Sequence, residues 1–221
     1  MQHYLETLTK EFEHYKNAEI ALQQKAYVRN QFEYFGLKTA VRRGIQKPFL
    51  VKEYLPLHSE LKNIIEMLWE KPQREFQHFG QELVFKYVKR LEIKDIALFE
   101  FMIINKSWWD TVDFIAVKLL GAFFKIFPEQ RKKYIEKWLL SNNIWLKRSA
   151  LLFQLKYKDQ IDTKLLSKVV LFLLGSKEFF INKAIGWVLR EYSRTNPTWV
   201  VRFVETTELN PLSRREALRL M

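Results

Sequence analysis

Ser107-Trp108-Trp109-Asp110-Thr111-Val112-Asp113 begins one of several helices that the sequence predicts at regular spacing. Each of these helices opens with large apolar residues and follows a shorter partner helix. The anchor residues that mark them are Phe76, Trp109, Trp145, Phe180 and Leu212, spaced 33, 36, 35 and 32 residues apart. Such a period, with two helices in each unit, is typical of an α-solenoid built from HEAT-like antiparallel helix pairs.

The composition and the local signals also favour an all-α chain. Six glycines and six prolines in 221 residues argue against an all-β fold, and apolar residues recur at three- and four-residue steps. Helices are predicted to begin near Leu5, Ala18, Thr39, Leu57, Gln73, Ile93, Ser107, Pro128, Asn143, Thr163, Lys177, Asn196 and Pro211. Ser107, Asn143 and Ser176 are predicted helix caps. Because no linker interrupts the pattern, we expect a single domain over residues 1–221, curved, with a basic concave face.

The charge predicts a polyanionic partner. Lys and Arg total 37 against 25 acidic residues, a net charge of +12. Neutralising phosphates releases counterions, so this balance favours nucleic acid, although a basic surface without a partner gives the same count. The chain has no cysteine, and its four histidines lack metal-ligand spacing, so we expect no metal and no cofactor. No apolar run approaches the ~18 residues of a membrane span. We therefore expect a soluble cytoplasmic protein without a membrane partner.

Asp113 is the first candidate for chemistry. It lies four residues after Trp109, so on a helix both side chains project from one face, one turn apart. An aromatic surface beside a carboxylate suits a site that holds a flat cationic group. An ordinary helix acid that faces water or a neighbouring helix remains the alternative. Asp110, by contrast, is assigned to structure, because with Ser107 it resembles a capping box.

Two further positions carry open alternatives. Trp187 lies one turn after Lys183 and three residues before Arg190, which is the pattern of a nucleic-acid surface, but a tryptophan in mid-helix is also a common core residue. Gly186 beside it indicates close approach by a helix or a ligand. Arg148 stands on an apolar stripe and needs an anion, either an internal carboxylate or a phosphate.

These motifs together resemble the AlkD family of bacterial DNA alkylation-repair glycosylases, which are HEAT-like-repeat proteins. The most specific of them is Lys106-Ser107-Trp108-Trp109-Asp110-Thr111-Val112-Asp113. The others cover residues 27–32, 35–39, 142–150, 153–158, 176–192 and 212–217, so the resemblance extends over nearly the whole chain. Two departures are Thr111, where a serine is common, and Ala40, where a proline is common; neither touches the proposed chemistry.

The resemblance implies a DNA glycosylase that removes cationic alkylated purines, such as 3-methyladenine and 7-methylguanine, from double-stranded DNA. It implies catalytic roles for Asp113, Trp109 and Trp187 and DNA contacts by the residues Tyr27, Arg148, Lys156 and Arg190. We expect it to act as a monomer. The main alternative is a non-enzymatic HEAT-like module that binds DNA structures or an acidic protein. An RNA-binding protein that stacks bases on its aromatic residues is a third.

Overall fold

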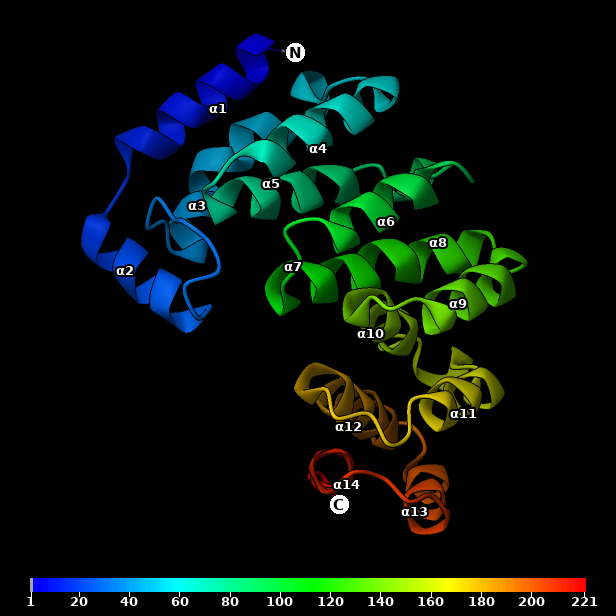
Figure 1. Cartoon of the computed structure of the whole chain (residues 1–221). Coiled ribbons are helices and arrows are strands. Elements are labelled where there is room, and N and C mark those ends of the chain that lie inside the picture. The colour runs from blue at the N-terminus through cyan, green and yellow to red at the C-terminus, as the bar shows by residue number, and fades with distance from the viewer. Residues whose placement is uncertain (1) are drawn as a thin grey trace. The chain divides into compact units, whose positions relative to one another are not determined.

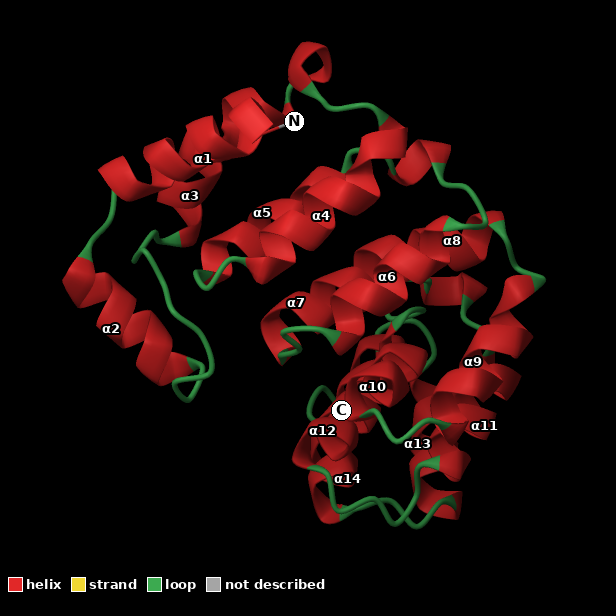
Figure 2. Ribbon diagram, turned by 45° about the horizontal axis from the view of Figure 1, so that its top comes forward, coloured by secondary structure: helices red, strands yellow, loops and turns green. Residues whose placement is uncertain are grey.

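The chain folds into helices joined by short loops. The computed structural model describes residues 2–221, and within that range no β-strand forms; Glu33 and Gln73 share an isolated bridge (Figure 2). The all-α prediction is therefore confirmed. The chain divides into two compact units, Met1–Arg90 and Leu91–Met221, and each is described by itself. The expectation of a single domain stays a prediction.

The first unit holds helices α1 to α5. Their bounds are α1 Gln2–His14, α2 Ala18–Tyr27, α3 Thr39–Gln46, α4 Leu61–Glu70 and α5 Arg74–Phe85. Short 3₁₀ helices at Lys47–Leu50, Lys52–Tyr54 and His58–Glu60 fill most of the connection between α3 and α4. The last of these explains why α4 begins at Leu61 although a helix was predicted to begin near Leu57.

A buried carboxylate fixes the loop between α2 and α3. Glu75 on α5 is 1% exposed, and its two oxygens accept the backbone N–H groups of Phe35, Gly36 and Leu37 at 3.0–3.1 Å. Gly36 has a positive φ of 87°, and a Cβ atom there would lie 2.0 Å from the carbonyl oxygen of Asn17. Only glycine fits at this point. The loop is thus held against both α2 and α5.

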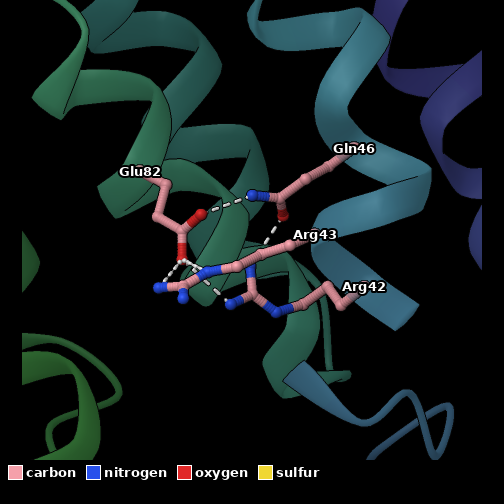
Figure 3. A network of polar contacts seen from close by, with 4 residues as sticks. All are labelled: Arg42, Arg43, Gln46 and Glu82. Atoms are coloured by element: carbon pink, nitrogen blue, oxygen red, sulfur yellow. Dashed lines mark hydrogen bonds and ion pairs between the residues drawn. The ribbon is translucent and has the colours of Figure 1, made fainter. Parts of the chain in front are cut away.

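A second polar network joins α3 to α5 (Figure 3). Arg42 is buried and donates to Gln46 at 2.6 Å and to Glu82 at 3.0 Å, and Arg43 donates to the same carboxylate oxygen at 3.0–3.1 Å. Burial raises the pKa of Glu82, but the charges and hydrogen bonds of both arginines outweigh it, so the net pKa lies below the ordinary value. Both Arg42 and Arg43 are therefore paired with Glu82.

The second unit holds helices α6 to α14. Their bounds are α6 Asp95–Ile104, α7 Trp109–Phe114, α8 Gly121–Ile126, α9 Gln130–Leu140, α10 Ile144–Leu152, α11 Thr163–Phe172, α12 Phe179–Ser193, α13 Pro197–Thr206 and α14 Pro211–Ala217. A π-helical segment, Ile115–Leu120, connects α7 to α8, and a short 3₁₀ helix covers Lys158–Gln160.

Successive helix pairs build the second unit. Helices α10, α12 and α14 lie in one layer, and α9, α11 and α13 lie in another (Figure 1). Helix α10 packs against α9, α11 and α12, and α12 packs against α13 and α14. This is the stacking of helix pairs that an α-solenoid requires, as the period of the anchors predicted. The curvature and the basic concave face stay predictions.

Several helix starts agree with the sequence signals, and two caps do not. Asn143 caps α10 by accepting the N–H groups of Trp145 and Leu146, as predicted. The predicted cap at Ser107 is wrong: its hydroxyl donates back to the carbonyl of Ile103 at 2.5 Å, and α7 begins after Trp108. The capping box proposed for Asp110 is therefore also absent; its carboxylate accepts the N–H of Thr111.

The predicted cap at Ser176 is wrong for a related reason. Its hydroxyl accepts the N–H of Glu178 at 3.2 Å, two residues along the loop, and Glu178 itself is the cap position of α12. A serine hydroxyl can donate to the preceding turn, as in Ser107, or accept from a nearby loop N–H group, as in Ser176. The presence of a serine therefore does not determine which residue begins the helix.

Gly186 lies where α12 meets α14. A Cβ atom on it would lie 2.5 Å from the Cβ of Glu216 and 2.9 Å from the carbonyl oxygen of Ser213. Ser213 also donates its hydroxyl to the carbonyl of Asn182 at 2.8 Å. The close approach that the glycine indicated is thus made by another helix, and it sets the distance between α12 and α14.

Candidate active site

Asp113 and Arg148 form a two-point ion pair in the second unit. Arg148 donates Nε to Oδ1 at 2.7 Å and Nη2 to Oδ2 at 2.8 Å. Its remaining arm, Nη1, donates to the carbonyl of Phe180 at 2.5 Å. The side chain of Arg148 is 4% exposed and that of Asp113 is 16% exposed. The carboxylate is therefore fixed in direction by α10 and α12 while one part of it remains open to a ligand.

Burial and pairing act in opposite directions on Asp113. Burial raises the pKa of this carboxyl, the hydrogen bonds and charge of Arg148 lower it, and nearby Asp110 raises it; the net pKa lies above the ordinary value. A carboxylate in such poorly solvated surroundings interacts strongly with a cation beside it. The site can therefore stabilise positive charge that develops close to Asp113.

The two candidate tryptophans lie on helices that Arg148 connects. Trp109 is the first residue of α7, one turn before Asp113, and it is partly exposed. Trp187 is also partly exposed, on α12, the helix whose Phe180 carbonyl binds Arg148. Trp187 is therefore not a fully buried core residue, whereas its neighbour Val188 is.

The candidate cations all have acidic partners. The sequence left open whether Arg148 pairs with a carboxylate or a phosphate, and the structure supplies the carboxylate of Asp113. Lys156 pairs with Glu191 at 2.5 Å and is 57% exposed. Arg190 pairs with Glu216 at 2.7 Å and is 22% exposed. Exposed ion pairs are weak, so the pair of Lys156 costs least to separate and the pair of buried Arg148 costs most.

Glu216 on α14 pairs with two cations of α12. It binds Lys183 at 2.8 Å and Arg190 at 2.7 Å. Arg214, on the same helix as Glu216, donates to the carbonyl of Val204 at 3.0 Å. Two cations that flank Trp187 on α12 are thus held by one acid from α14.

Tyr27 belongs to the first unit. It is the last residue of α2 and is 73% exposed. The next residues, Arg29 and Asn30, both have positive φ, so a tight turn follows the tyrosine. Its proposed contact with DNA stays a prediction.

Trp108, Trp145 and Phe180 form a cluster of three rings that the sequence did not predict. Their centroids lie 5.7 Å apart for the two tryptophans, 5.2 Å for Trp108 and Phe180, and 5.0 Å for Trp145 and Phe180. We call it the three-ring cluster. A signal for it was present, because these residues come from three of the stretches whose spacing revealed the repeat.

Two of the ion pairs join residues that are about one repeat apart in the sequence. Asp113 and Arg148 are 35 residues apart, as are Lys156 and Glu191. Residues one repeat apart occupy equivalent places on stacked helices. Opposite charges at that separation are therefore candidates for ion pairs.

Neither a metal centre nor a membrane span is found within residues 2–221. No group of three or more histidine, aspartate or glutamate side chains in the described part of the chain is arranged to hold a metal ion. No helix among these residues is long and apolar enough to cross a membrane.

Comparison with known proteins places these features in context. Residues 8–221 match the model of the family described as DNA alkylation repair enzyme. A solved structure described as a predicted DNA alkylation repair enzyme from Enterococcus faecalis is similar, with 32% sequence identity and a TM-score of 0.87. That alignment covers 93% of this chain and 96% of the other. No curated protein matches this chain significantly.

Proposed function

Because this chain belongs to the DNA alkylation repair enzyme family, we propose that it is a DNA glycosylase that hydrolyses the N-glycosidic bond of cationic alkylated purines in duplex DNA. The observation that carries the proposal is the carboxylate of Asp113, oriented by Arg148 and partly open, one helical turn from the partly exposed Trp109. The substrates that fit are 3-methyladenine and 7-methylguanine. We propose that it acts as a monomer in the cytoplasm.

The chemistry of these lesions matches an anionic site. Alkylation at N3 or N7 places a positive charge on the purine, which then leaves as a neutral base when the bonding electrons move from the glycosidic bond onto its ring nitrogen. The sugar develops oxocarbenium character, and a nearby carboxylate stabilises that charge. Water adds to the anomeric carbon and releases a proton to the solvent, while Asp113 orients this water.

The tryptophans hold the lesion nucleotide. A cationic nucleoside over an indole face gains about 0.5–2 kcal/mol from the ring quadrupole. Trp109 lies one helical turn from Asp113 on α7, and Trp187 lies on α12, the helix whose Phe180 carbonyl binds Arg148. The proposed reaction requires no metal and no cofactor, since the leaving group is already activated by its own charge.

Excision is expected to fall on acidification, because protonated Asp113 no longer stabilises a cation. The pKa of Asp113 lies above the ordinary aspartate value, so the rate should decline at a higher pH than ordinary aspartate predicts. Arg148 lowers that pKa; Arg148→Ala should move the decline to still higher pH. The test is single-turnover rates over pH 4–8, corrected for spontaneous depurination. Lys156→Ala is the control. A decline at the same pH in Arg148→Ala and wild type would contradict the assignment.

Lys156 is expected to contribute a phosphate contact. Lys156→Ala should reduce the slope of log K against log salt for duplex binding by about 1. The matched control is Lys168→Ala on α11, since Lys168 is equally exposed and is paired with Glu136 at 2.8 Å. Fluorescence anisotropy over a range of salt concentrations measures both. Equal slopes for the two variants would remove Lys156 from the phosphate contacts.

The function itself is tested by release of 7-methylguanine from a duplex that carries one lesion, under single-turnover conditions. Release well above the spontaneous rate supports a glycosylase. Tight duplex binding without release supports the non-enzymatic module that binds DNA structures, and preference for single-stranded RNA supports the RNA-binding alternative. Binding to neither nucleic acid leaves an acidic protein partner.

A further inference from the structure

We propose that Phe180 is a positioning residue for the Asp113–Arg148 pair, acting through the three-ring cluster. The activity part of this inference rests on the proposed glycosylase function, but its structural part does not. Phe180 touches Arg148 in two ways: its carbonyl accepts Nη1 at 2.5 Å, and its ring lies 5.9 Å from the guanidinium carbon. It is thus the third support of an arginine whose other two arms hold the carboxylate.

The three rings lie at the starts of the three helices that carry the site. Trp108 is the cap position of α7, which carries Trp109 and Asp113. Trp145 is the second residue of α10, which carries Arg148, and Phe180 is the second residue of α12, which carries Trp187. Contact among the rings therefore links the beginnings of these helices. A shift of one ring is therefore passed first to the start of the helix that follows it.

Phe180 connects the cluster to the ion pair. Its ring contacts both tryptophans, with centroids at 5.2 and 5.0 Å, while its own backbone binds Arg148. Phe180 and Trp108 are partly exposed and Trp145 is buried, so removing the ring of Phe180 takes away its contacts with both tryptophans and frees the start of α12 to move. Because the carbonyl belongs to the same residue, such movement reaches Nη1 of Arg148 and, through Nε and Nη2, both oxygens of Asp113.

The charges that face Asp113 determine how the movement is detected. They are Arg148 from α10 and Asp110 from its own helix. If Arg148 loses its alignment, it no longer lowers the pKa of Asp113, while burial and Asp110 continue to raise that pKa. The titration midpoint of Asp113 must then rise. A residue that merely stabilises the fold does not move this midpoint.

The experiment compares Phe180→Leu with Phe124→Leu. Phe124 is a fully buried ring of the same unit, in contact with Phe123, Trp138 and Phe153. The first measurement is titration of the Asp113 carboxyl by carbon-13 NMR, with the signal assigned by its loss in Asp113→Asn. The second is the single-turnover rate of 7-methylguanine release, and the third is the duplex Kd.

We expect Phe180→Leu to raise the titration midpoint and lower the release rate by about 10–100-fold, with Kd nearly unchanged. Phe124→Leu should lower the melting temperature without either effect. A Phe180→Leu midpoint equal to that of wild type in a folded protein overturns the proposal. If Phe180→Leu does not fold, Trp145→Phe, a smaller change in the same cluster, should show the same direction, and an unchanged midpoint there is equally decisive.

The two proposals fail separately. If wild type releases no base but Phe180→Leu still raises the Asp113 midpoint, the positioning role stands and the glycosylase function does not. If wild type releases base and Phe180→Leu behaves like Phe124→Leu, the function stands and the positioning role does not.

Discussion

Replacing Asp113 with asparagine is expected to lower the single-turnover rate of 7-methylguanine release by roughly 100- to 1000-fold, the size of effect seen when one electrostatic stabiliser is removed. The amide keeps the shape of the side chain but carries no charge for the developing oxocarbenium ion. Duplex Kd should stay constant or decrease slightly, because a negative charge near phosphates is lost. Release from a lesion-bearing duplex and anisotropy with the same duplex measure the two quantities.

The matched control is Asp110→Asn. It makes the same chemical change three residues earlier on α7, at a partly exposed carboxylate whose Oδ1 accepts the N–H of Thr111. Asp113→Asn also leaves Arg148 buried without its anion, which is destabilising, so melting temperatures of both variants are needed. A folded Asp113→Asn protein that excises at the wild-type rate would refute the assignment of Asp113.

Replacing Glu75 with alanine is expected to have the largest effect on stability. Three backbone N–H groups, those of Phe35, Gly36 and Leu37, lose their acceptor in a buried setting. At about 1–3 kcal/mol for each of the three unsatisfied groups, the loss is on the order of 3–9 kcal/mol. Hydrogen exchange at these three amides, together with thermal unfolding, measures it. Protection should disappear in the loop between α2 and α3 first.

A surface glutamate provides the comparison. Glu66 on α4 is 40% exposed and pairs with Lys62 at 3.9 Å, so Glu66→Ala should change stability by less than about 0.5 kcal/mol. Glu75→Gln is the intermediate case, because its amide oxygen still accepts hydrogen bonds but its NH₂ group faces a donor. Unchanged exchange at Phe35, Gly36 and Leu37 in Glu75→Ala would show that another group replaces the carboxylate.

Local signals predicted the helices well because the start of a helix depends mainly on residues that are close to it in the sequence. Asn143 caps α10, and Pro197 and Pro211 occupy first-turn positions, as expected from their own chemistry. Ser107 failed because a serine hydroxyl bonds equally well to the preceding turn. The pairing of Trp109 with Asp113 was also local, since one helical turn separates them.

The rest of the site was harder to predict because its contacts join distant helices. Glu216 binds Arg190 from 26 residues away, and nothing near either residue distinguishes this partner from others. The Phe180 carbonyl that accepts from Arg148 was equally hard to predict, because every residue has a backbone carbonyl and the side chain does not mark this one. For contacts between distant helices, the repeat period was the only signal in the sequence. It predicts which residues lie on stacked helices but not which of them form hydrogen bonds or ion pairs.

The missing side chain at Gly186 also makes α12 depend on α14 for its cover. The face of α12 at Gly186 packs directly on Ser213 and Glu216, so a chain cut before residue 211 lacks both contacts. In that shortened chain Lys183 and Arg190, the cations beside Trp187, also lack the acid that pairs with them. Loss of the last short helix therefore uncovers apolar and positively charged surface together, and such surface promotes aggregation.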